Sequence, residues 1–382
     1  MMLQKRPPMG WNTWNTFGPD ISESMIKEHV DLIVSTGLRD AGYSYVVIDD
    51  GWALKNRDEN GRLVPDPKKF PNGMKAVADY VHANGLKFGI YTCSGSMTCL
   101  QTQPGSYDYE YIDAKTFAEW EVDFLKFDFC LRTPIMPAKY LYRRMGMALA
   151  NCGRDILYSA CSWGKEETHE WIKTTGAAMW RSGDDIANSF ESVKKIIINQ
   201  LNILPYNGLG CFNDLDMLIV GMNNDSYIDG TLGTNGCTIG EQKTHFAIWC
   251  LFGSPLMIGC DIRRISPEAL EILKTKEAIA INQDALYGQP YRITHKSRRD
   301  ERLVYAKPLE NGDLAVGIFN LGDKEFEFTF GTDEMGIPTH CGKKLIATEV
   351  FTGEQAELCC GMFNTTVDAH DCRLYRCKLV DA

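Results

Sequence analysis

The sequence has no phosphate-binding loop and no surplus of basic residues. No GxGxxG or GxxxxGK[ST] pattern follows any of its apolar segments, which argues against a nucleotide-binding open sheet. Fifty acidic residues stand against forty basic ones, so the formal net charge is −10. Such a charge repels phosphate backbones and anionic lipid headgroups. We therefore expect neither nucleic acid nor a membrane as a partner.

Long apolar runs and an apolar leader are also missing. No segment approaches the roughly 18 to 20 consecutive apolar residues that cross a bilayer. The first eight residues contain two prolines and two basic residues instead of an apolar signal core. From these two absences we predict cytoplasmic localisation.

Cysteine is frequent, with fourteen in the chain, but the arrangements that bind zinc are missing. There are no paired CxxC motifs and no nearby histidines at metal-site spacing. The cysteines are scattered through a large chain, unlike the dense disulfide framework of a small secreted domain. We expect no metal and no cofactor.

Up to about residue 290, short apolar segments alternate with longer amphipathic ones, which is typical of βα units. The first amphipathic segment has apolar residues at positions 26, 30 and 33. We expect Asp20 and Glu23 to cap this helix and Gly37 to end it in a left-handed turn. Strand candidates lie at 9–14, 45–48, 87–91, 124–127, 156–159, 179–181, 209–212 and 256–258. Eight strands with intervening helices predict a (β/α)8 TIM barrel over residues 1–290.

The pattern changes after residue 290. Short strand-like runs at 303–305, 314–319, 326–330, 344–347 and 374–379 are separated by Gly, Asn and Asp turn signals, with no convincing helix between them. Residues 291–382 are therefore expected to form a C-terminal antiparallel β-sandwich domain.

In a TIM barrel the active site forms at the C-terminal ends of the strands. Side chains suited to a sugar site follow seven of the candidate strands: Trp11, Asp49, Asp50, Tyr91, Lys126, Asp128, Ser162, Trp163, Arg181, Asp185, Asp214 and Asp216. Burying so many charges is unfavourable for stability. A sugar, however, stacks its C–H faces on aromatic rings and bonds its hydroxyls to charged groups. We therefore expect a small-molecule carbohydrate substrate.

Each position also has a purely structural interpretation. Asp49 and Asp50 precede a glycine and could form a tight turn. Lys126 and Asp128 alternate with apolar neighbours and could be a structural ion pair. An aspartate at 184 or 185 could cap the helix expected from about residue 189. The joint placement of these residues favours a functional site over the separate structural explanations.

Eight segments carry a resemblance to glycoside hydrolases of clan D, family 27, which contains α-galactosidases and α-N-acetylgalactosaminidases. They are PMGWNTW at 8–14, IDDGW at 48–52, GLKFGIY at 85–91, LKFDFC at 125–130, WRSGDDI at 180–186, FNDLDM at 212–217, GSPLMIGCD at 253–261 and INQD at 281–284. The resemblance covers nearly the whole chain. It implies a retaining exo-glycosidase that removes terminal α-linked galactose.

Carried over position by position, the resemblance implies that Asp128 attacks the anomeric carbon and Asp185 is the general acid/base. Retention requires the two carboxyls to lie about 5 to 5.5 Å apart with different pKa values. Lys126 would help to keep the nucleophile charged.

The resemblance implies binding roles for further residues. Asp49 and Asp50 are similar to the family's acceptors for the O4 and O6 hydroxyls, and Arg181 and Asp216 to its contacts around O2 and O3. The expected pocket also includes Trp11 and Trp163 as walls, together with Tyr91 and Ser162. Cys99 and Cys130 match a pair that the family joins by a disulfide under the sugar.

The sequence departs from the family's pattern near the expected pocket. Phe129 follows the nucleophile where relatives often have Asn or Gly, and Cys93 stands where many have Asp. Ser162 matches the N-acetylgalactosaminidases, but Lys165 stands where they have a small residue. Galactose is therefore ranked first, N-acetylgalactosamine second and β-L-arabinopyranose third.

Two other classes of function compete with this interpretation. A degenerate barrel could bind sugar without hydrolysing it, although the chain keeps both Asp128 and Asp185. A metal-dependent hydrolase could use the aspartates, but no histidine-containing ligand set accompanies them. The sequence leaves open whether the chain forms a homo-oligomer.

Overall fold

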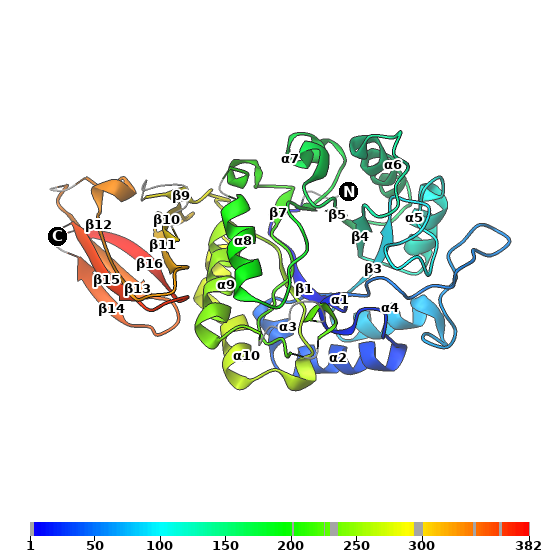
Figure 1. Ribbon diagram of the computed structural model, residues 1–382, viewed down its shortest axis with the longest axis horizontal. Helices are drawn as coiled ribbons and strands as arrows, with labels where there is room; N and C mark the ends of the chain where they lie inside the picture. The colour runs from blue at the N-terminus through cyan, green and yellow to red at the C-terminus, as the bar shows by residue number, and fades with distance from the viewer. Residues whose placement is uncertain are drawn as a thin grey trace. The chain divides into compact units, whose positions relative to one another are not determined.

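A computed structural model describes residues 4–200, 202–224, 226–229, 236–293, 301–338, 341–358 and 361–381. The chain forms two compact units, Met1–Gly236 with Pro255–Ile265, and Cys237–Ser254 with Ser266–Ala382. Figure 1 labels many of the helices and strands of both units. The boundary expected at residue 290 stays a prediction. Within the described residues, no helix is long and apolar enough to cross a membrane.

The first unit is built on eight parallel strands. They are β1 (Met9–Asn12), β2 (Tyr45–Val47), β3 (Lys87–Cys93), β4 (Phe124–Asp128), β5 (Leu157–Cys161), β6 (Met179–Arg181), β7 (Phe212–Asp214) and β8 (Leu256–Ile258). Their spatial order is β7-β6-β5-β4-β3-β2-β1-β8. Leu218, just after β7, bridges Ile258 in parallel, and its N–H donates to the Met257 carbonyl oxygen at 2.7 Å. This bridge closes the sheet, which confirms the predicted TIM barrel.

Helices follow the strands of the barrel unit in chain order: α1 (Trp14–Phe17), α2 (Glu23–Ser35), α3 (Leu38–Ala41), α4 (Gly73–Ala83), α5 (Glu110–Glu119), α6 (Ala138–Ala150), α7 (Thr168–Trp171) and α8 (Phe190–Gln200). Short 3-10 turns lie at Lys165–Glu167, Ile172–Thr174, Leu204–Tyr206, Tyr227–Asp229 and Ile262–Arg264. Figure 1 shows helices α4, α5 and α6 as coils beside β3 and β4.

Two local predictions in this unit need correction. The N-cap of α2 is Ser22, whose hydroxyl accepts from the Met25 N–H at 3.3 Å, so Asp20 and Glu23 are not the capping pair. The seventh strand begins at Phe212 and not at residue 209. The apolar residue at 209 misled the assignment, because Gly208 and Gly210 both have positive φ and form a turn before the strand. Gly37 does adopt the expected left-handed conformation, with φ 82°.

The described residues of the second unit form three α-helices and eight strands. The helices are α9 (Ile239–Phe252), α10 (Pro267–Leu273) and α11 (Lys276–Asn282). The strands are β9 (Tyr291–Arg292), β10 (Arg302–Pro308), β11 (Leu314–Asn320), β12 (Phe326–Gly331), β13 (Lys343–Glu349), β14 (Gln355–Leu358), β15 (Met362–Val367) and β16 (Cys372–Asp381), with a 3-10 turn at Asp333–Met335. One antiparallel sheet has the order β14-β13-β16-β11-β10-β9, and β12 pairs with β15 in a second.

The apolar core of this unit takes side chains from both sheets, which confirms the predicted sandwich. Phe330 on β12 stacks on Phe363 of β15 at 5.1 Å, and Phe363 meets Tyr375 of β16 edge-on at 5.2 Å. Strands β14 and β15 escaped prediction. Their polar, exposed positions give the alternation too little apolar signal, as the three exposed residues at the start of β14 illustrate.

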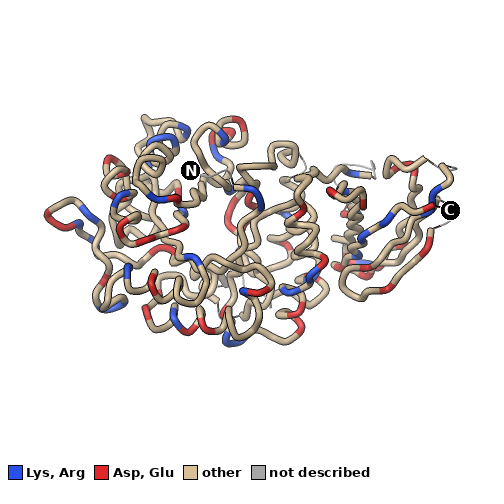
Figure 2. The backbone as a smooth tube through the Cα atoms, turned by 180° about the vertical axis from the view of Figure 1, so that it is seen from behind, with Lys and Arg blue, Asp and Glu red and all other residues tan. Residues whose placement is uncertain are grey.

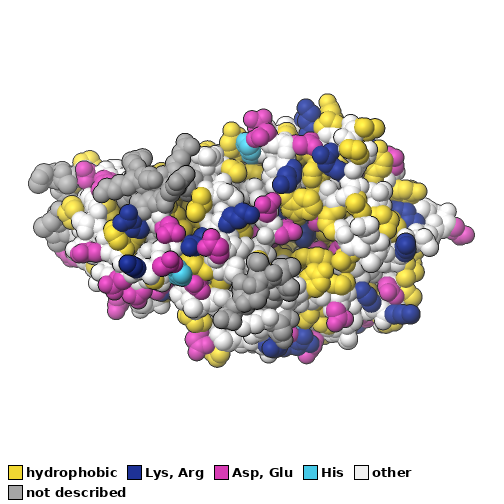
Figure 3. All heavy atoms as spheres, viewed as in Figure 1, with side chains coloured by type: hydrophobic (Ala, Val, Ile, Leu, Met, Phe, Trp, Pro, Cys, Tyr) yellow, Lys and Arg dark blue, Asp and Glu magenta, His cyan; other side chains and the backbone are white. Residues whose placement is uncertain are grey.

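Charged residues of both signs occur along both units (Figure 2). On the face drawn in Figure 3, acidic and basic side chains are interspersed and do not form a patch of one sign. Six of the buried charged residues lie at or just after the ends of barrel strands: Asp49, Asp50, Asp128, Arg181, Asp214 and Asp216.

Candidate active site

Two neighbouring carboxylates lie directly after β2 in the barrel. Asp49 and Asp50 are each only 1% exposed. Oδ2 of Asp49 accepts from Asn12 Nδ2 and from Lys126 Nζ, both at 2.8 Å. The Asp50 carboxylate accepts from the N–H groups of Gly51 at 2.7 Å and Leu100 at 3.0 Å. These bonds fix the orientation of both carboxylates, although burial still raises the pKa of Asp50.

Lys126 on β4 supplies positive charge to this part of the barrel. Besides its bond to Asp49, its Nζ lies 5.4 Å from the centre of the Tyr91 ring. Burial lowers the pKa of Lys126, but the carboxylates of Asp49 and Asp128 outweigh that effect and hold the pKa above its usual range. Lys126 is therefore a permanent cation in the site.

Asp128 ends β4, two residues after Lys126 and on the same side of the strand. One carboxylate oxygen accepts from the Tyr91 hydroxyl at 3.1 Å, and the other from the Phe129 N–H at 2.7 Å. Burial raises the pKa of Asp128 to about 6, against the opposing effect of Lys126 and with a further contribution from the charge of Asp185. Asp185 therefore lies near enough for its charge to act on Asp128.

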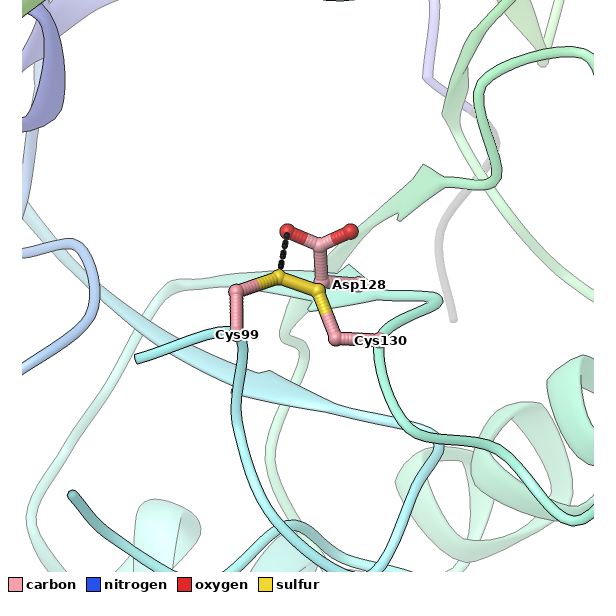
Figure 4. A group of neighbouring side chains, drawn as sticks. All are labelled: Cys99, Asp128 and Cys130. Carbon is pink, nitrogen blue, oxygen red and sulfur yellow. Dashed lines mark hydrogen bonds between the residues drawn. A yellow bond between two sulfur atoms is a disulfide. The ribbon is translucent and has the colours of Figure 1, made fainter. Parts of the chain in front are cut away.

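A disulfide between Cys99 and Cys130 lies directly beneath the Asp128 carboxylate (Figure 4). Sγ of Cys99 is 3.8 Å from Oδ2 of Asp128 and 3.6 Å from the Tyr91 hydroxyl. The structure thus confirms the pairing that the resemblance implied. Ten other described cysteines are free thiols.

Arg181 at the end of β6 binds two carboxylates at once. One terminal nitrogen of its guanidinium lies 2.9 Å from Asp185 and 2.9 Å from Asp216. Asp216 is almost fully buried, and its carboxylate also accepts from the N–H groups of Ile186 and Met217, both at 2.7 Å. Asp185, by contrast, is 67% exposed, so it stands at the entrance of the site.

The two carboxyls that the resemblance assigns to catalysis have opposite pKa shifts. Desolvation by neighbouring groups acts to raise the pKa of Asp185, but the charges of Arg181 and Lys126 outweigh it and lower the pKa below its ordinary value. The pKa of Asp128 is raised instead, to about 6.

One predicted site residue lies elsewhere. Trp11 is fully buried on β1, its indole N–H donates to the Cys260 carbonyl at 2.8 Å, and its ring stacks on His29 of α2 at 4.5 Å. The alternation of β1 directs Trp11 toward the helix layer and Asn12 toward Asp49 in the interior. Trp11 is therefore not a pocket wall.

The indole near the site is Trp14, which the sequence analysis missed. It begins α1 immediately after β1, its N–H donates to Asn12 at 2.8 Å, and its ring meets Tyr227 edge-on at 5.1 Å. It is only partly buried. The alternation of side chains along β1 could have shown this, because Asn12 points into the barrel and Trp11 points away from it. An aromatic wall at this strand must then come from a residue after Asn12.

The loop after β5 carries Ser162 and Trp163. The Ser162 hydroxyl is fully buried and donates to Thr168 at 2.8 Å, because Thr168 itself donates to the Lys165 carbonyl. Trp163 has φ 53° and meets Phe129 edge-on at 6.3 Å. Lys165 Nζ lies 3.5 Å from Asp184 at the surface. The structure therefore brings Trp163 next to the β4 end, while the Ser162 hydroxyl is already satisfied.

Three groups in the described residues bring potential metal ligands within 4.8 Å of one another: Cys99 with Asp128 and Cys130; Asp79 with His82 and Glu121; and Glu167 with His169 and Glu170. In the first group, the two cysteines are already joined to each other by the disulfide. Lys75 makes ion pairs with Asp79 and Glu121 in the second. Only the first group belongs to the site described above.

Comparison with known proteins places this site in a family. The chain matches the family model for alpha galactosidase A at residues 6–284 and the model for the alpha galactosidase C-terminal β-sandwich domain at residues 300–377. It is 39% identical to an α-galactosidase of Cyamopsis tetragonoloba over 98% of this chain and 86% of that protein. It is 40% identical to an α-galactosidase of Coffea arabica over 97% and 93%, respectively.

Solved structures agree with the sequence comparisons. The crystal structure of α-galactosidase I from Mortierella vinacea superposes with a TM-score of 0.89 at 32% identity, covering 99% of this chain and 97% of that one. The two family models and these relatives thus match both parts of the chain. The chain belongs to glycoside hydrolase family 27 and is a glycosidase.

Proposed function

We propose that this glycosidase releases terminal α-linked galactose from oligosaccharides or glycoconjugates by double displacement with retention. The observation that carries the proposal is that Asp128 ends β4, while Asp185 is bound by Arg181 of β6 and lies near enough for its charge to raise the pKa of Asp128. Retaining glycosidases use two such carboxyls, one as nucleophile and one as acid/base. The α-galactosidase relatives support galactose as the sugar.

Asp128 is the proposed nucleophile. It is held by the Tyr91 hydroxyl and the Phe129 N–H, so its attacking oxygen is fixed before substrate arrives. The nearby Lys126 favours its charged form, and burial keeps the negative charge poorly solvated and hence reactive. Attack on the anomeric carbon gives a covalent glycosyl-enzyme, which water then hydrolyses.

Asp185 is the proposed acid/base, and its position at the pocket entrance suits contact with the departing oxygen. Its lowered pKa in the empty site is opposite to what the first step needs. We propose that substrate reverses this order. Sugar hydroxyls take over part of the hydrogen bonding of Arg181, and the leaving group shields Asp185 from water, so that its pKa rises.

The remaining charged groups suit the recognition of sugar hydroxyls. Asp49, Asp50 and Lys126 are proposed to bind O4 and O6, and Arg181 with Asp216 to bind O2 and O3. Each of these groups is fixed by hydrogen bonds or ion pairs within the barrel before substrate arrives. Orientation before binding lowers the entropy lost when the sugar enters. We propose Trp14 and Trp163 as the aromatic walls, with Tyr91 beneath the sugar.

Galactose remains ahead of the other two sugars. The fully buried hydroxyl of Ser162 gives its only proton to Thr168 and so cannot donate to an acetamide carbonyl, and Lys165 extends toward Asp184 across the adjacent loop. Both observations disfavour N-acetylgalactosamine. Nothing in the described site favours β-L-arabinopyranose specifically.

Turnover of p-nitrophenyl α-galactoside, α-N-acetylgalactosaminide and β-L-arabinopyranoside tests the sugar, and proton NMR of the first-formed galactose anomer tests retention. We expect the galactoside to have the highest kcat/KM and the α-anomer to appear first. Sugar binding without turnover of any of the three would support the degenerate-barrel alternative. Loss of activity in EDTA would support the metal-dependent one.

We also propose that the protein works in the cytoplasm. Among the described cysteines ten are free thiols and two form the Cys99–Cys130 disulfide, and this excess of free thiols supports a reducing environment. Fractionation of cells expressing the native gene, followed by galactosidase assay of each fraction, tests this. Activity found only outside the cytoplasm would contradict it.

A further inference from the structure

The disulfide beneath the nucleophile has potential ligand chemistry that the proposed hydrolysis does not use. Cys99 is exposed at the pocket, whereas Cys130 is 8% exposed and Asp128 is 6% exposed. Their two sulfurs and one carboxylate oxygen all lie within 4.8 Å of one another. Figure 4 shows the carboxylate directly over the S–S bond. Because Cys99 is exposed, we expect a small reductant to reach the bond from its side.

We propose that reduction of the Cys99–Cys130 disulfide creates a site for a thiophilic divalent cation such as Cd²⁺ or Zn²⁺, and that this cation blocks Asp128. The blocking part rests on the proposed function, in which Asp128 is the nucleophile. The binding part depends only on the three ligands.

The geometry suits such a cation. In tetrahedral zinc sites the metal lies about 2.3 Å from thiolate sulfur and about 2.1 Å from carboxylate oxygen, which sets the sulfur and oxygen about 3.6 Å apart. Sγ of Cys99 is 3.8 Å from Oδ2 of Asp128. The Cα atoms of the two cysteines are 5.1 Å apart, which is close enough for both thiolates to bind one cation after reduction. Two thiolates select soft cations over Mg²⁺ or Ca²⁺.

The chemical steps balance with a small dithiol as reductant. Thiol–disulfide exchange passes two electrons and two protons to the S–S bond, giving two thiols and the oxidised dithiol. The cation then displaces the two thiol protons, which are released to solvent. The Asp128 carboxylate donates an oxygen lone pair as third ligand. Its lone pair is then no longer available to attack the anomeric carbon.

The other two ligand groups in the described chain do not share these properties. They contain only histidine and carboxylate ligands, and in one of them Lys75 already binds both carboxylates. Neither contains sulfur, and neither changes when a disulfide is reduced. Only the group at Asp128 is expected to respond to the redox state.

The test compares the full-length protein in its oxidised form with the same protein after reduction by a small dithiol, which is then removed under nitrogen. Cd²⁺ binding is followed by thiolate-to-cadmium ultraviolet absorption and equilibrium dialysis. The reduced form should take up one more Cd²⁺ per chain than the oxidised form. With free Cd²⁺ at about ten times its Kd, galactosidase activity of the reduced form should fall about tenfold. Chelator should restore it, and Cd²⁺ should leave the oxidised form unaffected.

Variants locate the extra cation. Cys130→Ser removes one ligand and should abolish the redox-dependent uptake. Cys341→Ser removes an exposed free thiol of the second unit and should leave that uptake unchanged. Free galactose should compete with Cd²⁺ for the reduced protein, a readout that requires neither turnover nor a variant.

Several results would overturn the inference. Equal Cd²⁺ uptake by the oxidised and reduced forms would overturn it, as would redox-dependent uptake that persists in Cys130→Ser. Uptake that neither lowers the galactosidase rate nor is reduced by free galactose would show that the cation does not block Asp128. Failure of the proposed function is a different result, because untreated protein would then turn over no galactoside while the binding measurements remained valid.

Discussion

The interior end of the barrel and the core of the β-sandwich bury their side chains for different reasons. At the barrel end, Asp49, Asp128, Arg181 and Asp216 are all buried charges. The sandwich core is formed by apolar residues, with Phe330, Phe363 and Tyr375 in ring contact. At the barrel end, charged groups have lost their contact with water. In the sandwich core, apolar surface is removed from water.

The difference separates groups that serve chemistry from groups that serve stability. Burying ionised groups destabilises a fold unless partners compensate, and the raised pKa values of Asp128 and Asp216, about 6 and about 7, show that compensation is incomplete. Apolar burial stabilises by about 25 cal/mol per Å². Mutations in the two regions should therefore affect different measurements.

The largest expected effect is on the rate, from Asp128→Asn. Loss of a nucleophile costs on the order of 10⁴-fold in kcat, while the pocket keeps its shape. The folded-state pKa of about 6 lies above the ordinary 3.8, so ionised Asp128 destabilises the fold above that pH range. Asn removes this penalty, and the Tm at pH 7 should stay equal or rise. A large fall in Tm as well as in kcat would contradict the separation between groups that serve chemistry and groups that serve stability.

Asp185 offers a matched pair for the same comparison. Asp185→Asn should also reduce kcat strongly. Asp184→Asn, which removes an exposed carboxylate paired with Lys165 and Lys195, should change kcat/KM by less than about twofold. Equal losses from the two variants would show that Asp185 has no special role.

The next effect concerns stability, in the sandwich. Phe363→Ala should destabilise the second unit by about 3 to 5 kcal/mol, because Phe363 is 3% exposed and packs on two other rings. Met362→Ala on the same strand, at 50% exposure, is the control and should change stability by less than about 0.5 kcal/mol. Chemical denaturation measures both. Well below the transition, kcat and KM of Phe363→Ala should match wild type; an altered kcat would indicate coupling of this core to catalysis.

A smaller effect is expected on the pH profile. Asp128 must be ionised to attack, so kcat/KM should fall as pH drops below about 6. Lys126 lowers the pKa of Asp128, so Lys126→Met should move this acidic limb to higher pH by about one unit or more. Lys115→Met, which removes an exposed lysine, is the control. A limb that does not move would mean that Asp128 is not the titrating group.

The smallest expected effect is on specificity. Lys165→Ala removes the side chain that extends to Asp184. The kcat/KM for the α-N-acetylgalactosaminide relative to the galactoside should rise by about threefold, equivalent to less than about 1 kcal/mol. An unchanged ratio would show that Lys165 does not limit room for the acetamide.

The βα alternation was readable because buried parallel strands are short apolar runs with turn signals at each end. The seventh strand was displaced because Leu209 is apolar but lies between two glycines in a turn, 46% exposed. Strands β14 and β15 were missed because their exposed positions carry little apolar signal. The apolar pattern of the sequence thus located strands and helices with a buried face better than it located elements at the surface.

The sequence alone determined the two architectures, the strand ends that carry charge, and the Cys99–Cys130 pair through its family resemblance. Only the tertiary structure decided which side chains meet. It directed Trp11 to the helix layer and left Trp14 beside the site, and it placed Arg181 between Asp185 and Asp216. The physical reason is that period and composition fix which face of an element is buried. Contacts between elements depend on strand register and barrel closure, which bring together residues far apart in the chain.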